Sequence, residues 1–169
     1  IINEFGDIGI DGEVLKACCN GDCGEEDIVE LANGCLCCTV ADDFVPTIEG
    51  LLARDPLPDH IVIETSGLAL PKPLVRAFGW PEIRTRLTVD GVVAVVDGPA
   101  VDAGVFAADP DAVQEQREAD EALEHESPLE EVFDDQVNCA DLVIVNKTDQ
   151  MSTDSLERTA KGLRTKLRP

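Results

Sequence analysis

The chain has 169 residues, 35 of them Asp or Glu and 13 Lys or Arg, so its formal net charge is −22. This length predicts one domain with a core of its own. The acidic balance argues against a nucleic-acid partner, since phosphates would be repelled. No apolar run approaches the roughly 18 residues that a membrane span needs, so no membrane partner is expected. Seven cysteines, an odd number, favour reduced thiols and a cytoplasmic location.

Short β-rich runs alternate with helical patterns along the chain, which predicts an α/β domain with a parallel sheet. Strands are expected at the start of the chain and over residues 28–31, 60–64, 89–96 and 142–145. Helices are expected over residues 45–52, 71–78 and 152–167. Residues 109–135 carry twelve acids and one arginine, and this predicts a solvated helical excursion outside the sheet.

Asn146, Lys147 and Asp149 follow the apolar run 142–145, at the carboxyl end where doubly wound sheets bind ligands. The Asp149 carboxylate can accept hydrogen bonds from N1–H and the 2-amino group of guanine, and adenine offers neither donor on that edge. Lys147 can lie against the base, and Asn146 can fix the loop and reach the purine. The alternative is an ordinary polar turn after a strand. The residues alone favour neither interpretation, but the preceding strand favours guanine binding.

Glu64 and Gly67 belong to an apolar run followed by the turn Glu-Thr-Ser-Gly, the ETSG turn. Nucleotide hydrolases hold magnesium beside the phosphates with a carboxylate in this position. Glu64 is therefore a candidate magnesium ligand, through water, and the Gly67 N–H a candidate contact to a γ-phosphate. A strand-ending acid before a helix N-cap at Ser66 is the plainer alternative, and taken alone the residues favour it.

Cys35, Cys37 and Cys38, the cysteine triplet, place three thiols within four positions. Thiolates suit zinc, copper(I) or cobalt(II), and this spacing is tighter than a Cys-x-x-Cys knuckle. An open, transferable metal site is therefore favoured over a closed structural one. Three cysteines lie upstream: Cys18, Cys19 and Cys23. They could be further metal ligands or incidental members of a flexible loop, and the sequence favours neither interpretation.

Two other features carry weaker signals. The run NEFGDIGID at residues 3–11 suits either a mobile loop near phosphate or metal, or a plain connector. Cys139, just before the run 142–145, is expected to be a small core residue.

The stretches NEFGDIGID, GCLCC, ETSGLALP, VVDG and NKTD, in this order, resemble the CobW family of P-loop GTPases that handle metals. The similarity runs over nearly the whole chain, and ELANGCLCCTVADDFVPT and HIVIETSGLALPKPLV resemble the CobW branch, associated with cobalamin biosynthesis. The specific combination is Cys-x-Cys-Cys with Asn-Lys-x-Asp in one chain.

The resemblance implies a P-loop NTPase-like fold, a mostly parallel sheet with helices on both faces. It also implies a GTPase metallochaperone, in which the ETSG turn serves hydrolysis with magnesium, the NKTD loop (residues 146–149) binds GTP, and the cysteine triplet receives cobalt(II) or zinc. Hydrolysis would loosen residues 3–11 and release the ion to a client metalloenzyme, for the CobW branch the cobalt chelatase.

Two departures from the family pattern stand out. The P-loop G-x-x-x-x-G-K-[ST] is absent from these residues, together with the first strand, so this chain alone is expected to bind GTP poorly and to be inactive as a GTPase. The start within a strand predicts that the P-loop precedes Ile1 and that residues 1–169 are a partial GTPase domain lacking the family's C-terminal domain. Ile2 stands where some relatives carry a metal-binding Glu, for which Asp7 is a candidate substitute.

Two other functions fit the same residues. A metal-buffering module with a non-functional nucleotide site would make the missing P-loop genuine. Nickel delivery, as in the hydrogenase and urease accessory GTPases, is less favoured because their cysteine and histidine patterns differ from Gly-Cys-x-Cys-Cys.

Overall fold

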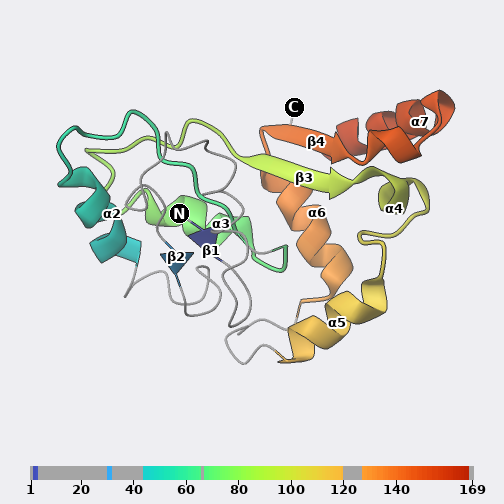
Figure 1. Cartoon of the computed structure of the whole chain (residues 1–169), viewed down its shortest axis with the longest axis horizontal. Helices are drawn as coiled ribbons and strands as arrows, with labels where there is room; N and C mark the ends of the chain where they lie inside the picture. Colours follow the sequence, from blue (N-terminus) through green and yellow to red (C-terminus); the bar gives the residue numbers. More distant parts are fainter. Residues whose placement is uncertain (1, 4–29, 32–43, 66, 120–126, 168–169) are drawn as a thin grey trace.

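The computed structural model describes residues 2–3, 30–31, 44–65, 67–119 and 127–167. The strands in this part of the chain form two parallel pairs: β1 (Ile2–Asn3) with β2 (Glu30–Leu31), and β3 (Val93–Asp97) with β4 (Leu142–Asn146). Asp97 stands opposite Asn146, so the carboxyl ends of β3 and β4 are level (Figure 1). The parallel pairing agrees with the predicted α/β class.

Helices lie between the successive strands β2, β3 and β4 and also follow β4 (Figure 1). They are α2 (Val45–Leu52), α3 (Pro71–Ala77), α4 (Gly98–Asp102), α5 (Pro110–Ala119), α6 (Leu129–Cys139), the 3-10 helix η3 (Thr148–Gln150) and α7 (Thr153–Arg164). Within the described residues, no helix is long and apolar enough to cross a membrane.

The three predicted helices are confirmed as α2, α3 and α7. The last shows why the sequence signals its bounds well. Ser152 caps its N-terminus, with its Oγ accepting a hydrogen bond from the Ser155 N–H at 3.2 Å. Lys161 and Arg164 in the last turn offset the negative end of the helix dipole.

The strand predictions are less accurate than the helix predictions. The run 142–145 is confirmed as β4, which extends one residue further, whereas β3 begins only at Val93 instead of residue 89. The buried strand expected over 60–64 is wrong: residues 61–63 lie outside any strand, Glu64 makes an isolated bridge, and Val62 is 79% exposed. The physical reason is that an apolar run becomes a buried parallel strand only where neighbouring strands pair with it and helices cover it.

The acidic stretch forms helices α5 and α6 within its described residues. Helix α6 is not a wholly solvated excursion, because Val132, Val137 and Cys139 are buried on its inner side. Glu130 and Glu131 lie in its first turn, where negative charge is favourable. The number of acidic residues in the stretch therefore did not indicate that part of it forms an amphipathic helix. The core position predicted for Cys139 is confirmed.

One apolar cluster lies around α2 and α3. Phe44, Ile48, Leu74, Ala77 and Ile83 are buried together. The Phe44 ring meets that of Phe78 edge to face, with centroids 5.1 Å apart. Ile63, just before the ETSG turn, packs against this cluster, and Leu74, after the turn, belongs to it. The cluster therefore anchors the chain on both sides of the ETSG turn.

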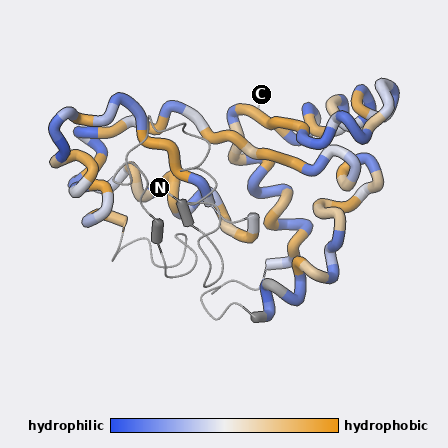
Figure 2. Tube along the Cα trace, in the orientation of Figure 1, coloured by the Kyte–Doolittle hydropathy of each residue, from blue (hydrophilic) through white to orange (hydrophobic). Residues whose placement is uncertain are grey.

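A second cluster lies under β3 and β4, where Val96, Val137 and Leu163 bring the strand pair, α6 and α7 together. The apolar course of both strands is visible in Figure 2. Successive strand residues point to opposite faces, and the other face of the pair is open. Its side chains are between 46% and 63% exposed: Val93, Val95, Leu142 and Ile144. Helices on both faces of the sheet are therefore not seen in the described residues.

Candidate functional site

The NKTD loop begins where β4 ends, beside the end of β3. Asn146 is the last residue of β4, and its Oδ1 accepts a hydrogen bond from the Lys147 N–H at 2.9 Å. Lys147 then adopts the left-handed conformation, with φ 56° and ψ 33°. That conformation costs a non-glycine residue roughly 1–2 kcal/mol, so the surrounding contacts must hold the turn that leads into η3.

Asp97, the last residue of β3, supplies one of those contacts. Its Oδ2 accepts a 2.6 Å ion-paired hydrogen bond from Lys147 Nζ, and its Oδ1 accepts from the Ala100 N–H at 3.1 Å, capping α4. The Lys147 hydrogen bond, followed by that from Ala100, holds the pKa of the Asp97 carboxyl below its ordinary value. One carboxylate thus joins the end of β3, the start of α4 and the NKTD loop.

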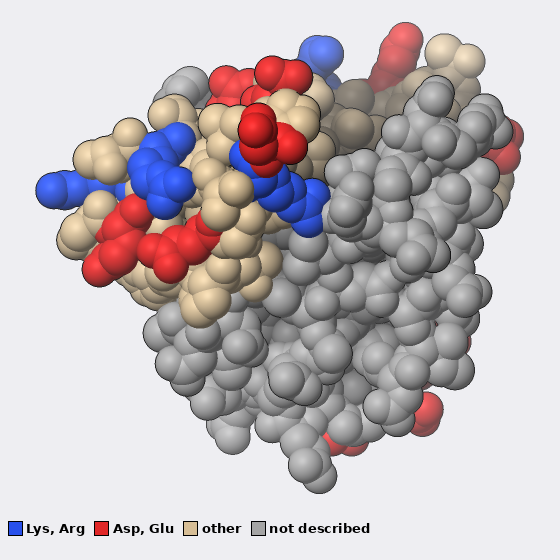
Figure 3. All heavy atoms as spheres, turned by 60° about the vertical axis from the view of Figure 1, so that its left-hand side comes forward, with Lys and Arg blue, Asp and Glu red and all other residues tan. Residues whose placement is uncertain are grey.

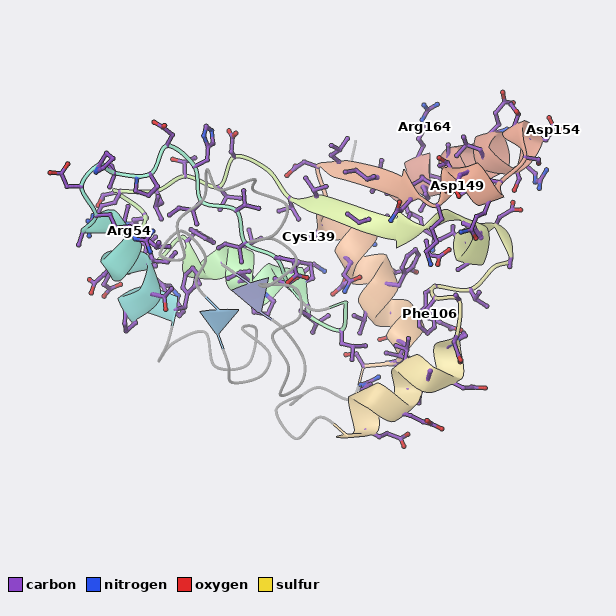
Figure 4. The ribbon with its side chains drawn as sticks, in the orientation of Figure 1. Arg54, Phe106, Cys139, Asp149, Asp154 and Arg164 are labelled. Carbon is purple, nitrogen blue, oxygen red and sulfur yellow. The ribbon has the colours of Figure 1, made fainter. Side chains whose placement is uncertain are left out.

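Asp149 lies in the first turn of η3 and is exposed. In Figure 4 it stands beside the carboxyl ends of the two strands, close to α4. An exposed carboxylate at this edge has the freedom to accept hydrogen bonds from a ligand. The structure therefore places Asn146, Lys147 and Asp149 together, as the sequence predicts for adjacent loop residues.

Gly98 lies where α4 passes closest to the NKTD loop. A Cβ there would stand 2.5 Å from Met151 Sδ, 2.8 Å from the Asn146 carbonyl oxygen and 2.8 Å from Val145 Cγ1. The carbonyl oxygen belongs to the end of β4, so it can move only if the loop moves. Close packing of α4 against the loop therefore requires glycine at this position.

We expect Gly98→Ala to destabilise the fold by about 1–3 kcal/mol, the usual cost of overpacking. The matched control is Gly162→Ala in α7, where a Cβ meets nothing within 4 Å. That variant is expected to stabilise the fold by about 0.5–1 kcal/mol, because alanine is the better helix former. Urea unfolding of both variants measures the difference, and equal stabilities would contradict the packing described for Gly98.

The ETSG turn is held by a different element. Glu64 and Gly67 are exposed, while the next two residues, Leu68 and Ala69, are 5% and 3% exposed. The Gly67 and Ala69 carbonyls accept hydrogen bonds from Gln136 Nε2 of α6 at 2.8 and 2.9 Å. Gly67 thus contacts α6, whereas the described contacts of the NKTD loop are to β3 and α4.

An open groove of about 830 Å³ lies between α4, α6 and α7, and Phe106 marks its side in Figure 4. Its basic side chains are already paired, Arg158 with Asp102 at 3.2 Å and Lys166 with Asp134. The hydrogen bond from Ser155 is the main cause that lowers the pKa of Asp102. None of the residues lining the groove belongs to the NKTD loop or the ETSG turn, so the groove is separate from the predicted site.

The cysteine triplet, Cys18, Cys19, Cys23 and Asp7 lie outside the described residues, so the thiol site stays a prediction. Within the described part of the chain no group of three or more His, Cys, Asp or Glu side chains could hold a metal ion. Figure 3 shows acidic and basic side chains interspersed on the described part of one face.

Two contacts of the site were not predicted from the sequence. Asp97 belongs to the motif VVDG, which only marked the resemblance, and its pairing with Lys147 follows from the level register of β3 and β4. Gln136 gave no signal, because a glutamine in an acidic helix has the pattern of a solvated residue. Its role depends on a partner 69 positions away in the sequence.

Two parallel strands have level ends, and β3 continues directly into α4 while β4 continues into the NKTD loop and α7. This arrangement defines the class of the molecule as an α/β domain, and ligands of such domains bind at the carboxyl ends of the strands. Comparison with known proteins takes this further. The family model described as "CobW/HypB/UreG, nucleotide-binding domain" matches residues 1–169, and the chain therefore belongs to this family. The resemblance that the motifs carry is confirmed.

Two curated relatives are named "Zinc chaperone CobW". The one from Sinorhizobium sp is 60% identical over 157 residues, and the one from Pseudomonas aeruginosa is 59% identical over 162. These matches cover 93% and 94% of this chain but 44% and 43% of the relatives. A "Zinc-regulated GTPase metalloprotein activator 1" from Schizosaccharomyces pombe is 32% identical over 157 residues, 92% of this chain and 33% of the relative. The chain thus spans less than half the length of these relatives, and no solved structure matches it.

Proposed function

We propose that this chain is the nucleotide-binding part of a GTP-dependent metallochaperone. The observation that carries the proposal is the NKTD loop, held by Asp97 and Gly98 at the level ends of β3 and β4, in a chain that belongs to the CobW/HypB/UreG family. The metal cargo is zinc, as the names of the relatives suggest, or cobalt(II). The recipient is a client metalloenzyme, and the cobalt chelatase of cobalamin biosynthesis is the specific candidate.

Each described site residue has a role in this proposal. Asp149 accepts hydrogen bonds from guanine and so selects GTP over ATP. Asn146 and Lys147 hold the loop and contact the base. Glu64 and Gly67 lie at the phosphate end, where the Gly67 N–H faces the γ-phosphate and hydrolysis is proposed to occur.

Glu64 also fits the demands of magnesium. This ion is usually held by one or two carboxylates, by waters and by the phosphates of the nucleotide rather than by a full protein cage. Glu64 is exposed, so its carboxylate is accessible to such an ion. Magnesium would neutralise the phosphate charge there.

The metal half of the proposal rests on the cysteine triplet. Cobalt(II) bound to thiolates in a near-tetrahedral site is expected to give intense visible d–d bands and near-ultraviolet charge-transfer bands. Replacing Cys35, Cys37 and Cys38 together by serine should abolish these bands. Binding should also weaken on acidification, because thiolate rather than thiol is the ligand.

Cys139→Ala is the matched control, since this thiol is buried and lies in α6. It should leave the cobalt(II) bands unchanged. Variants at Cys18 and Cys23 test whether the upstream cysteines contribute ligands. Unchanged bands in the triple variant would contradict the thiol site.

A further inference from the structure

Gln136 links α6 to the ETSG turn by an unusual pair of hydrogen bonds. Its side-chain nitrogen donates to two carbonyl oxygens two residues apart in the sequence, those of Gly67 and Ala69, at 2.8 and 2.9 Å. A glutamine amide nitrogen carries two N–H donors, and both partners here are acceptors. The contact therefore depends on the amide nitrogen, and a carboxylate of the same shape cannot replace it.

Both sides of this contact include residues that are buried in the core. Val132 and Val137 are buried at 2% and 0% exposure, so α6 presents Gln136 from an element that is fixed in the core. Leu68 and Ala69 are buried on the other side. A neighbouring ion pair between Lys72 and Asp135, at 2.6 Å, joins α6 to α3, the helix that follows the ETSG turn. The two side chains of that pair are 43% and 38% exposed, so it contributes little to stability. The specific contact between α6 and the ETSG turn is therefore the one made by Gln136.

Gly67 needs such a hold, since glycine has more backbone freedom than any other residue. A Cβ at Gly67 would meet nothing within 4 Å, so packing in the described structure does not require glycine there. The backbone of Gly67 is therefore open to the approach of a ligand. The Gly67 carbonyl lies in one peptide plane with the Gly67 Cα. Fixing this carbonyl therefore holds in place the Cα to which the Gly67 nitrogen is bonded.

We propose that Gln136 is a positioning residue for phosphoryl transfer, which holds Gly67 beside the γ-phosphate through its hydrogen bonds to the Gly67 and Ala69 carbonyls. This inference rests on the proposed function, because it assigns Gln136 to the same nucleotide site. According to this inference, a residue of α6 sets the position of the backbone that contacts the γ-phosphate. Helix α6 is the helix that precedes β4 and the NKTD loop in the chain.

The test compares Gln136→Glu and Gln136→Leu in the full-length protein that carries this sequence. Both variants remove the two N–H donors at nearly constant size. The turnover number for GTP should fall between about 10- and 100-fold, the scale of misplaced reacting groups. The affinity for GDP should stay unchanged, because GDP has no γ-phosphate. The control is Gln114→Glu, because the Gln114 side chain donates to Glu118 of its own helix α5.

Unchanged turnover in the Gln136 variants, or a GDP affinity that falls by the same factor as turnover, would overturn the inference. A wild-type protein that shows no GTP hydrolysis would instead contradict the proposed function. Amide hydrogen exchange over residues 67–72 then decides about Gln136 without any nucleotide. Exchange should be faster in both Gln136 variants than in Gln114→Glu, and equal rates would overturn the positioning role.

Discussion

Replacing Asp149 by alanine is expected to weaken the binding of GTP and GDP by about 1–3 kcal/mol, the usual value of a bidentate contact to a base. The loss should be specific to guanine, because the carboxylate matches donors that adenine lacks. Competition between labelled GDP and unlabelled GTP or ATP measures it, in the full-length protein that carries this sequence. Equal displacement by ATP in the unchanged protein would refute the guanine assignment.

Asp154→Ala is the matched control for this experiment. Asp154 is an exposed aspartate in the first turn of α7, five positions after Asp149, and Figure 4 shows it away from the strand ends. Its replacement removes the same charge and should leave guanine binding unchanged. A loss of similar size in both variants would show that the acidic field, and not the base contact, determines the affinity.

A second substitution at the same position tests the direction of the hydrogen bonds. Asparagine in place of Asp149 offers one donor and one acceptor, and xanthine presents an oxygen where guanine has its 2-amino group. Asp149→Asn should therefore shift the preference from guanosine to xanthosine nucleotides. Alanine cannot produce this shift, so the two variants together separate a lost contact from a general distortion of the loop.

How far the sequence predicts this structure depends on how local each signal is. Helix α7 carries its own cap at Ser152 and its own basic end, and its prediction is confirmed. The expected strand at 60–64 is wrong because strand formation depends on neighbours that a local pattern does not specify. Val62 is part of an apolar run, yet it is 79% exposed.

The candidate site shows the same division. Asn146, Lys147 and Asp149 are contiguous, so their spacing could be predicted as a unit. Asp97 contacts Lys147, which is 50 positions away in the sequence, and the register of β3 with β4 brings the two together. Gln136 contacts Gly67, which is 69 positions away, and the packing of α6 brings these two together. A glutamine or an aspartate has no local pattern that reveals such a role.

The larger question is whether nucleotide binding and metal binding are coupled, since coupling separates a chaperone from a buffer. In the described residues, contacts connect the ETSG turn to the NKTD loop by way of α6 and β4. Helix α6 holds the carbonyl of Gly67 through Gln136 and continues directly into β4, which ends at Asn146. A γ-phosphate bound at Gly67 would therefore act on an element that is packed in the core and connected to the NKTD loop.

If GTP tightens metal binding, the metal must tighten GTP binding by the same factor. A useful switch needs a coupling of roughly 1–3 kcal/mol, or about 5- to 150-fold in affinity. We expect zinc and cobalt(II) to bind the full-length protein more tightly by this factor with magnesium and a non-hydrolysable GTP analogue than with magnesium and GDP. Metal titrations in the two nucleotide states, paired with nucleotide titrations with and without metal, measure both directions of the coupling.

The two directions provide an internal check, because unequal factors would reveal a second binding event. Identical metal affinities in the two nucleotide states would favour the metal-buffering module over the chaperone. Residues 1–169 alone, which lack a P-loop, serve as the control. Their metal binding should ignore the nucleotide, because the backbone cradle and lysine that hold the phosphates are missing from this sequence.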